Sequence, residues 1–201
     1  MLFTIAAPAA DRPLKIVALG DSLMAGYQLP GSDAFPAQLE KALREKGVAV
    51  EIANAGVSGD TSSGGLSRLD WSVPDGTDAV ILGLGANDML RGVPAEVTRK
   101  SLDAIIQRLK ARNIEVMLCG MLAAPNLGPD YARGFNPIYP ELASNHGVIF
   151  YPFFLDGIAA EPKFNQRDGM HPNAEGVARV VVRIMPKAEE LIARVRAKRG
   201  S

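Results

Sequence analysis

The sequence is poor in residues that build disulfides and metal sites, because its 201 residues include one cysteine and two histidines. Cys119 can form no disulfide within the chain, and so few ligating side chains argue against a structural zinc site. Cys119 ends an apolar run, which favours a buried and unreactive thiol. We therefore predict no bound metal.

The chain also lacks an excess of either charge, with 22 Lys and Arg residues against 22 Asp and Glu residues. Nucleic-acid binding domains need a basic footprint, so we predict no nucleic-acid partner. No apolar stretch approaches the roughly 18 residues that span a bilayer, so we predict no stable membrane insertion. These features leave the oligomeric state open.

The first ten residues are apolar and end in Ala-Pro-Ala, which resembles an export cleavage site. No Lys or Arg precedes the apolar part, and that part is short for a signal peptide. We expect residues 1–13 to be a leader remnant or a tail. The remaining length suits one α/β domain with a sizeable core, which we expect over residues 14–197.

Five short apolar runs alternate with helical patterns, which predicts a parallel sheet with helices on both faces. The runs cover residues 16–19, 48–53, 78–84, 114–119 and 148–151, and the helical patterns cover 34–46, 62–69, 94–112, 131–144 and a last segment from 173. We predict a flavodoxin-like, three-layer α/β/α sandwich with strand order 2-1-3-4-5. Trp71 is expected to pack against the sheet, and Pro186 to kink or divide the last helix.

The first apolar run stops abruptly at Gly20-Asp21-Ser22-Leu23. Glycine allows a sharp turn there, so Ser22 is predicted to lie on the loop that leaves the carboxyl end of a buried strand. Open α/β sheets bind ligands at that edge. Taken alone, Asp21 and Ser22 would more simply cap the next helix or close a turn, as most Asp-Ser pairs do.

Serine hydrolysis needs an imidazole base and a group that orients it, and the sequence offers two histidines. His146 is expected at the opposite end of the sheet, as a surface or capping residue. His171 precedes Pro172, which disfavours helical backbone at that position. Asp168, three residues earlier, can bind Nδ1 of His171 and leave Nε2 free to face Ser22, although an Asp turn before a helix would look the same.

Four blocks occur in one order, namely Gly20-Asp-Ser-Leu23, Asn54 to Ser62, Gly83 to Asp88 and Asp168 to Asn173. Together they resemble the SGNH (GDSL) hydrolase family, and most closely its small bacterial lysophospholipase, thioesterase and arylesterase branch. The resemblance covers residues 16–184 and implies Ser22, Asp168 and His171 as catalytic residues. It implies an oxyanion hole made by the N–H groups of Ser22 and Gly59 and the amide of Asn87.

Individually, Gly59 and Asn87 could be ordinary turn residues. The third block has Ala86 where the family often has glycine. The Gly-x-Ser-x-Gly elbow of α/β-hydrolases is missing, since Met24 stands two residues after Ser22. The glycine-rich loops lack the dinucleotide fingerprint and the P-loop lysine, so we predict no cofactor.

The resemblance implies a serine hydrolase that cleaves carboxylic esters or thioesters through an acyl-enzyme on Ser22. Four apolar residues beyond the catalytic blocks are predicted to contact the acyl group, although Leu122 could equally belong to the core: Met24, Leu90, Leu122 and Phe164. A carbohydrate O-acetyl esterase with the same triad and a non-catalytic flavodoxin-like binding module are the alternatives. The resembled branch is often exported, which favours a periplasmic or secreted location over a cytoplasmic one.

Overall fold

A computed structural model describes residues 12–200 of the chain. The predicted leader lies outside the described residues except for Arg12 and Pro13. Five strands form one parallel sheet with the order β2-β1-β3-β4-β5, as predicted. The strands are β1 (Leu14–Gly20), β2 (Val50–Gly56), β3 (Ala79–Gly83), β4 (Glu115–Cys119) and β5 (Ile149–Tyr151).

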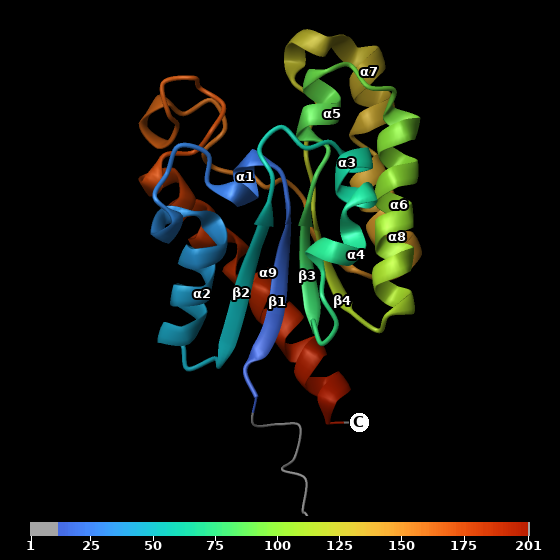
Figure 1. Cartoon of the computed structure of the whole chain (residues 1–201). Helices are drawn as coiled ribbons and strands as arrows, with labels where there is room; N and C mark the ends of the chain where they lie inside the picture. Colours follow the sequence, from blue (N-terminus) through green and yellow to red (C-terminus); the bar gives the residue numbers. More distant parts are fainter. Residues whose placement is uncertain (1–11, 201) are drawn as a thin grey trace, which may run out of the picture.

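Helices cover both faces of this sheet (Figure 1). On one face, α2 (Phe35–Glu45) packs against α9 (Ala174–Arg199). On the other face, α6 (Ala95–Ala111) lies between α3 (Ser62–Ser67) and α8 (Ile138–His146). The remaining helices are short: α1 (Ser22–Ala25), α4 (Leu69–Ser72), α5 (Ala86–Leu90), α7 (Gly128–Phe135) and the 3₁₀ turns η2 (Gly31–Asp33), η3 (Pro125–Leu127) and η4 (Pro162–Phe164).

The core consists of the buried strand residues and of the apolar helix faces that pack against the sheet. Strand β3 is buried from Ala79 to Leu82, which fits a strand covered on both faces. Helix α6 contributes a buried stripe at helical spacing: Leu102, Ile105, Ile106 and Leu109. The apolar runs and helical patterns of the sequence therefore became the predicted elements.

One local expectation was wrong, and of the second, a kink or a division of the last helix at Pro186, the division was wrong. Trp71 is 80% exposed, because Leu69 and Val73 are the residues that face inward from the single turn of α4 and the segment after it. Pro186 does not divide the last helix, which runs unbroken from Ala174 to Arg199.

The strand order reverses at β1, because β2 lies on one side of it and β3 on the other. A crevice opens outside the carboxyl ends of the strands at such a switch point. The four sequence blocks therefore follow strands or precede α9 on the same edge of the sheet. No helix among the described residues combines the length and apolar character needed to cross a bilayer.

Candidate active site

Ser22 is the first residue of α1, directly beyond the end of β1. Asp21 caps this helix, since its Oδ1 accepts a hydrogen bond of 3.0 Å from the N–H of Leu23. The structure confirms the capping role, and the cap fixes the start of the helix that carries Ser22 at the carboxyl end of β1. The Ser22 side chain remains partly accessible to solvent.

A continuous chain of hydrogen bonds joins Ser22, His171 and Asp168. Nε2 of His171 lies 2.9 Å from Oγ of Ser22, and its Nδ1 lies 2.6 Å from Oδ2 of Asp168. Ser22 lies near the start of the sequence, and Asp168 and His171 lie near its end. Ser22 and His171 are 149 residues apart. An imidazole held this way can take the serine proton at Nε2 while Nδ1 stays protonated toward the carboxylate.

The turn around Asp168 explains why its carboxylate is so well placed. Its Oδ1 accepts hydrogen bonds from the N–H groups of Met170 (2.9 Å) and His171 (3.0 Å), and Gly169 turns the chain with φ of +71°. Hydrogen bonds from the backbone of His171 and Met170 and from the His171 ring lower the pKa of Asp168 to about 2. Asp168 is therefore an anion throughout the neutral range.

The aromatic ring of Tyr27 contacts His171, with ring centroids 4.6 Å apart. Gln166 holds this arrangement, because its side-chain amide donates to the carbonyl oxygens of Tyr27 (2.8 Å) and Pro172 (3.0 Å). No sequence motif indicates Tyr27 or Gln166 as a site residue. Neither stands out by type or spacing, and their role depends on contacts between segments far apart in the chain.

Three hydrogen-bond donors lie on the segments that follow β1, β2 and β3. Within residues 12–200, the backbone N–H groups of Ser22 and Gly59 have no protein acceptor. Asn87, on α5, donates one Nδ2 hydrogen to the carbonyl oxygen of Asp60 at 3.0 Å, which leaves its second hydrogen available. Gly59 has φ of +83°, a conformation that favours glycine. These are the groups that the family resemblance implies for an oxyanion hole.

Two arginine side chains bind the loop that carries Gly59. Arg91 donates to the carbonyl oxygen of Gly59 at 2.6 Å. Arg68 pairs with the carboxylate of Asp60 at 2.7 Å. The sequence offered a signal for Arg68, which is the one charged residue in the otherwise neutral stretch 61–69.

A small cavity of about 10 Å³ lies beneath the Ser22 segment and is lined mainly by apolar side chains, among them Met24, Leu84 and Phe154. Asp21 also lines it and is 1% exposed. Burial raises the pKa of Asp21 to about 6, against the opposing effect of the hydrogen bond from Leu23. Cys119 lines it as well, and burial raises the pKa of its thiol.

The predicted acyl-contacting residues divide into three groups. Leu90 and Leu122 are 54% and 46% exposed, and they follow Asn87 and β4 on the edge that carries Ser22. Met24 is 1% exposed and fills the space that Gly20 and Gly83 leave, so its predicted substrate contact is corrected to a core contact. Phe164 is half-buried, and its ring contacts the guanidinium of Arg179 at 4.9 Å.

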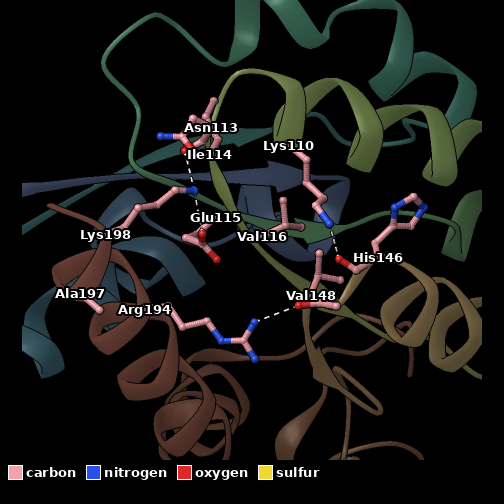
Figure 2. Close-up of a pocket in the computed structure, with 11 residues that line it drawn as sticks. Lys110, Asn113, Ile114, Glu115, Val116, His146, Val148, Arg194, Ala197 and Lys198 are labelled. Carbon is pink, nitrogen blue, oxygen red and sulfur yellow. Dashed lines mark hydrogen bonds and ion pairs between the residues drawn. The ribbon is translucent and has the colours of Figure 1, made fainter. Parts of the chain in front are cut away.

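A hollow of about 640 Å³ lies at the opposite edge of the sheet (Figure 2). Its cations already bind main-chain oxygens: Lys110 contacts that of His146, Arg194 that of Gly147, and Lys198 that of Asn113. His146, as predicted, lies at this opposite end, where it closes α8. Within residues 12–200, no cluster of His, Cys, Asp or Glu side chains could hold a metal ion.

A parallel α/β/α sandwich with a Ser-His-Asp chain and unused donors at its carboxyl edge is the arrangement typical of serine hydrolases. The chain belongs to the GDSL-like Lipase/Acylhydrolase family, whose model matches residues 18–179.

Named relatives cover most of the chain. An arylesterase of Vibrio mimicus is 39% identical over 176 residues, which is 87% of this chain and 88% of that one. Thioesterase 1/protease 1/lysophospholipase L1 of Escherichia coli (strain K12) is also 39% identical over 176 residues, 87% of this chain and 82% of that one. The crystal structure of AlinE4, an SGNH-hydrolase family esterase, superposes with a TM-score of 0.76 at 42% identity, covering 89% of this chain and 96% of that one.

Proposed function

We propose that the protein hydrolyses carboxylic esters or thioesters through an acyl-enzyme on Ser22. The observation that carries this proposal is the hydrogen-bonded chain from Ser22 through His171 to Asp168, at 2.9 and 2.6 Å. The 39% identity to an arylesterase and to a thioesterase/lysophospholipase supports it. We assign the catalytic domain to residues 14–197.

In the first half of the reaction, Oγ of Ser22 attacks the acyl carbonyl carbon while Nε2 of His171 takes its proton. Negative charge develops on the carbonyl oxygen, which the N–H groups of Ser22 and Gly59 and the amide of Asn87 stabilise. When the tetrahedral species collapses, the bond to the leaving oxygen or sulfur breaks. The imidazolium then gives its proton to that leaving alcohol or thiol.

In the second half, water attacks the acyl-enzyme and passes its proton to Nε2 of His171. The same donors stabilise the second tetrahedral species, and its collapse releases the carboxylic acid and returns the proton to Ser22. Asp168 keeps the imidazole in the correct tautomer and stabilises the imidazolium in both halves.

We infer an acyl group of medium length as the preferred substrate. Four exposed apolar side chains lie within the catalytic blocks or shortly after a catalytic block or strand β4: Val57, Leu90, Leu122 and Met170. Such side chains gain from covering a hydrocarbon chain, at somewhat under ~1 kcal/mol for each methylene group. The substrate is a small ester or thioester.

The decisive experiment measures nitrophenol release from esters of increasing acyl length. We expect kcat/KM to rise from acetyl toward medium chains and then to level or fall. Ser22→Ala should abolish the activity, whereas Ser67→Ala, which alters an exposed serine on α3, should leave it unchanged. Activity that persists in Ser22→Ala would refute the proposed nucleophile.

A matched pair of variants tests the acyl surface. Leu90→Ala should lower kcat/KM for medium chains more than for acetyl, while Val182→Ala, 73% exposed on α9, should not. A preference for acetyl esters, or activity on acetylated sugars alone, would instead indicate a carbohydrate deacetylase with the same triad. Thioester analogues of the best substrate would then decide between oxygen and sulfur leaving groups.

For the location, we propose export to the periplasm or beyond the cell, with the cytoplasm as the alternative. The Ala-Pro-Ala at residues 7–9 supports this proposal. Cell fractionation of the full chain tests it: recovery with cytoplasmic markers would overturn it.

A further inference from the structure

Arg68 lies between α3 and α4, next to the loop that carries Gly59 and Asp60, and its side chain is 15% exposed. All three nitrogens of its guanidinium have a partner. Nε donates to Oδ2 of Asp60 at 2.7 Å, Nη2 to the carbonyl oxygen of Gly20 at 2.9 Å, and Nη1 to Oγ of Ser72 at 2.9 Å.

Two of these partners belong to the active-site segments. Gly20 ends β1 and stands two residues before Ser22, while Asp60 directly follows Gly59. The Arg68 side chain therefore joins the nucleophile segment to the loop of the proposed oxyanion hole. The two segments are about 40 residues apart in sequence, and the N–H of Val57 donates to the same Gly20 oxygen at 3.0 Å.

The third oxyanion donor is connected to the same centre. The carbonyl oxygen of Asp60 accepts the Nδ2 hydrogen of Asn87, while the carboxylate of Asp60 is held by Arg68. Each of the three donors is thus within two residues or one hydrogen bond of an Arg68 partner. A displacement of the guanidinium would change the spacing between all three.

We propose that Arg68 is a positioning residue that sets the relative placement of the Ser22 N–H, the Gly59 N–H and the Asn87 amide. This inference rests on the proposed serine-hydrolase function. Arg68 contacts neither the triad nor the reacting atoms, so it acts through its partners. The planar guanidinium offers donors in fixed directions, which a lysine ammonium cannot reproduce.

Because the oxyanion donors act on charge that develops in the transition state, their misplacement should lower kcat and leave substrate binding nearly unchanged. We expect Arg68→Gln and Arg68→Lys to lower kcat by roughly 10- to 100-fold, with KM changed less than about threefold. The acid side of the pH-rate profile should keep its position, because Arg68 does not contact His171 or Asp168. Added guanidinium should restore part of kcat in Arg68→Ala.

Arg44 provides a matched control. Its Nε donates to the carbonyl oxygen of Val50 at 2.8 Å, and its guanidinium pairs with Glu40 at 3.0 Å. Like Arg68, it therefore binds a carbonyl oxygen of a strand and a carboxylate. These contacts lie at the start of β2, on the opposite edge of the sheet. Arg44→Gln should leave kcat unchanged and so separates positioning at the site from general loss of a strand contact.

Several outcomes would overturn the inference. An Arg68→Lys variant with wild-type kcat would show that charge alone suffices, and a loss seen chiefly in KM would indicate substrate binding. If Arg68→Gln does not fold, Arg68→Lys and Asp60→Asn carry the test, and wild-type kcat in both would reject the positioning role. Phosphonate labelling of Ser22 keeps the two proposals apart: an unlabelled wild-type chain refutes the proposed function, whereas labelling at equal rates in wild type and Arg68→Gln refutes this inference alone.

Discussion

The two histidines of the chain form similar pairs with very different surroundings. His171 and Asp168 lie 2.6 Å apart with side chains 18% and 31% exposed, and His146 and Asp103 lie 2.5 Å apart with side chains 16% and 36% exposed. By distance and burial alone the two pairs are nearly equivalent. A histidine-carboxylate pair therefore does not identify a catalytic site.

The second ring nitrogen and the sheet edge make the difference. His171 binds its carboxylate through Nδ1 and presents Nε2 to Ser22, beside unused backbone donors. His146 uses Nε2 for Asp103 and ends α8, where Lys110 and Arg194 bind the last carbonyl oxygens (Figure 2). Positive side chains at a helix C-terminus stabilise the helix. At this edge, formed by the amino ends of the strands, the histidine pair therefore contributes to the stability of the fold.

The largest expected difference between the two pairs concerns the histidines themselves. His171→Ala should lower kcat by about 10⁴- to 10⁶-fold, because it removes the proton acceptor of Ser22. His146→Ala should leave kcat within about twofold of wild type. Steady-state ester hydrolysis by both variants checks this.

The double variant Ser22→Ala/His171→Ala sharpens the result. If the two residues act as a unit, the double variant should be hardly slower than either single variant. If the losses in kcat multiply in the double variant, Ser22 and His171 do not act as a unit. A large loss of kcat in His146→Ala would contradict the proposal that only the His171 pair is catalytic.

The carboxylates should differ less than the histidines. Asp168→Asn should lower kcat by about 10² to 10⁴-fold, because the imidazole loses its orienting anion while the oxyanion donors remain. Asp103→Asn should leave kcat unchanged and cost at most about 1 kcal/mol of unfolding free energy, as expected for a partly exposed pair. Kinetics and denaturant unfolding of the two variants measure both effects.

The pH dependence of these variants separates two causes. Since the pKa of Asp168 is about 2, Asp168 stays ionised where activity first declines in acid. Protonation of Asp168 should therefore not be the cause of the first decline of activity in acid. An acid limb that vanished in Asp168→Asn but not in wild type would contradict this assignment.

A further difference concerns two aspartates, one at each edge: Asp21 is buried, and Asp78 is partly buried. At the amino edge, burial raises the pKa of Asp78, but hydrogen bonds from Arg12, Arg199 and the Lys15 N–H outweigh it and lower the pKa overall. At the carboxyl edge, burial dominates and raises the pKa of Asp21 to about 6. The two groups should thus give stability opposite dependences on pH.

A carboxyl whose pKa is higher in the folded state than in the unfolded state stabilises the fold at low pH and loses that contribution as pH rises through about 6. Relative to wild type, Asp21→Asn should therefore gain about 3 kcal/mol of unfolding free energy between pH 3 and pH 8. Asp78→Asn should change in the opposite direction over the acid range. Denaturant titrations at several pH values check this, and a pH-independent difference for Asp21→Asn would contradict it.

Much of the molecule follows from the sequence because its signals are local. Buried strands read as apolar runs, α6 reads as a 3.6-residue stripe, and the strand-end blocks place Ser22, Gly59 and Asn87 on one edge once the sheet is parallel. His171 and Asp168 are also local to each other, since a three-residue turn allows their contact.

The tertiary structure alone decided which contacts cross between segments. Arg68 reaches Gly20 across 48 residues, and Tyr27 meets His171 across 144, so neither pairing leaves a pattern within one window of sequence. Burial of single side chains is decided in the same way: Met24 is inside because two glycines leave room for it, and Trp71 is outside because Leu69 occupies the inward side of its short helix. The type of a residue determines its tendency to be buried. Whether the side chain is buried depends on the space that the packed neighbouring residues leave for it.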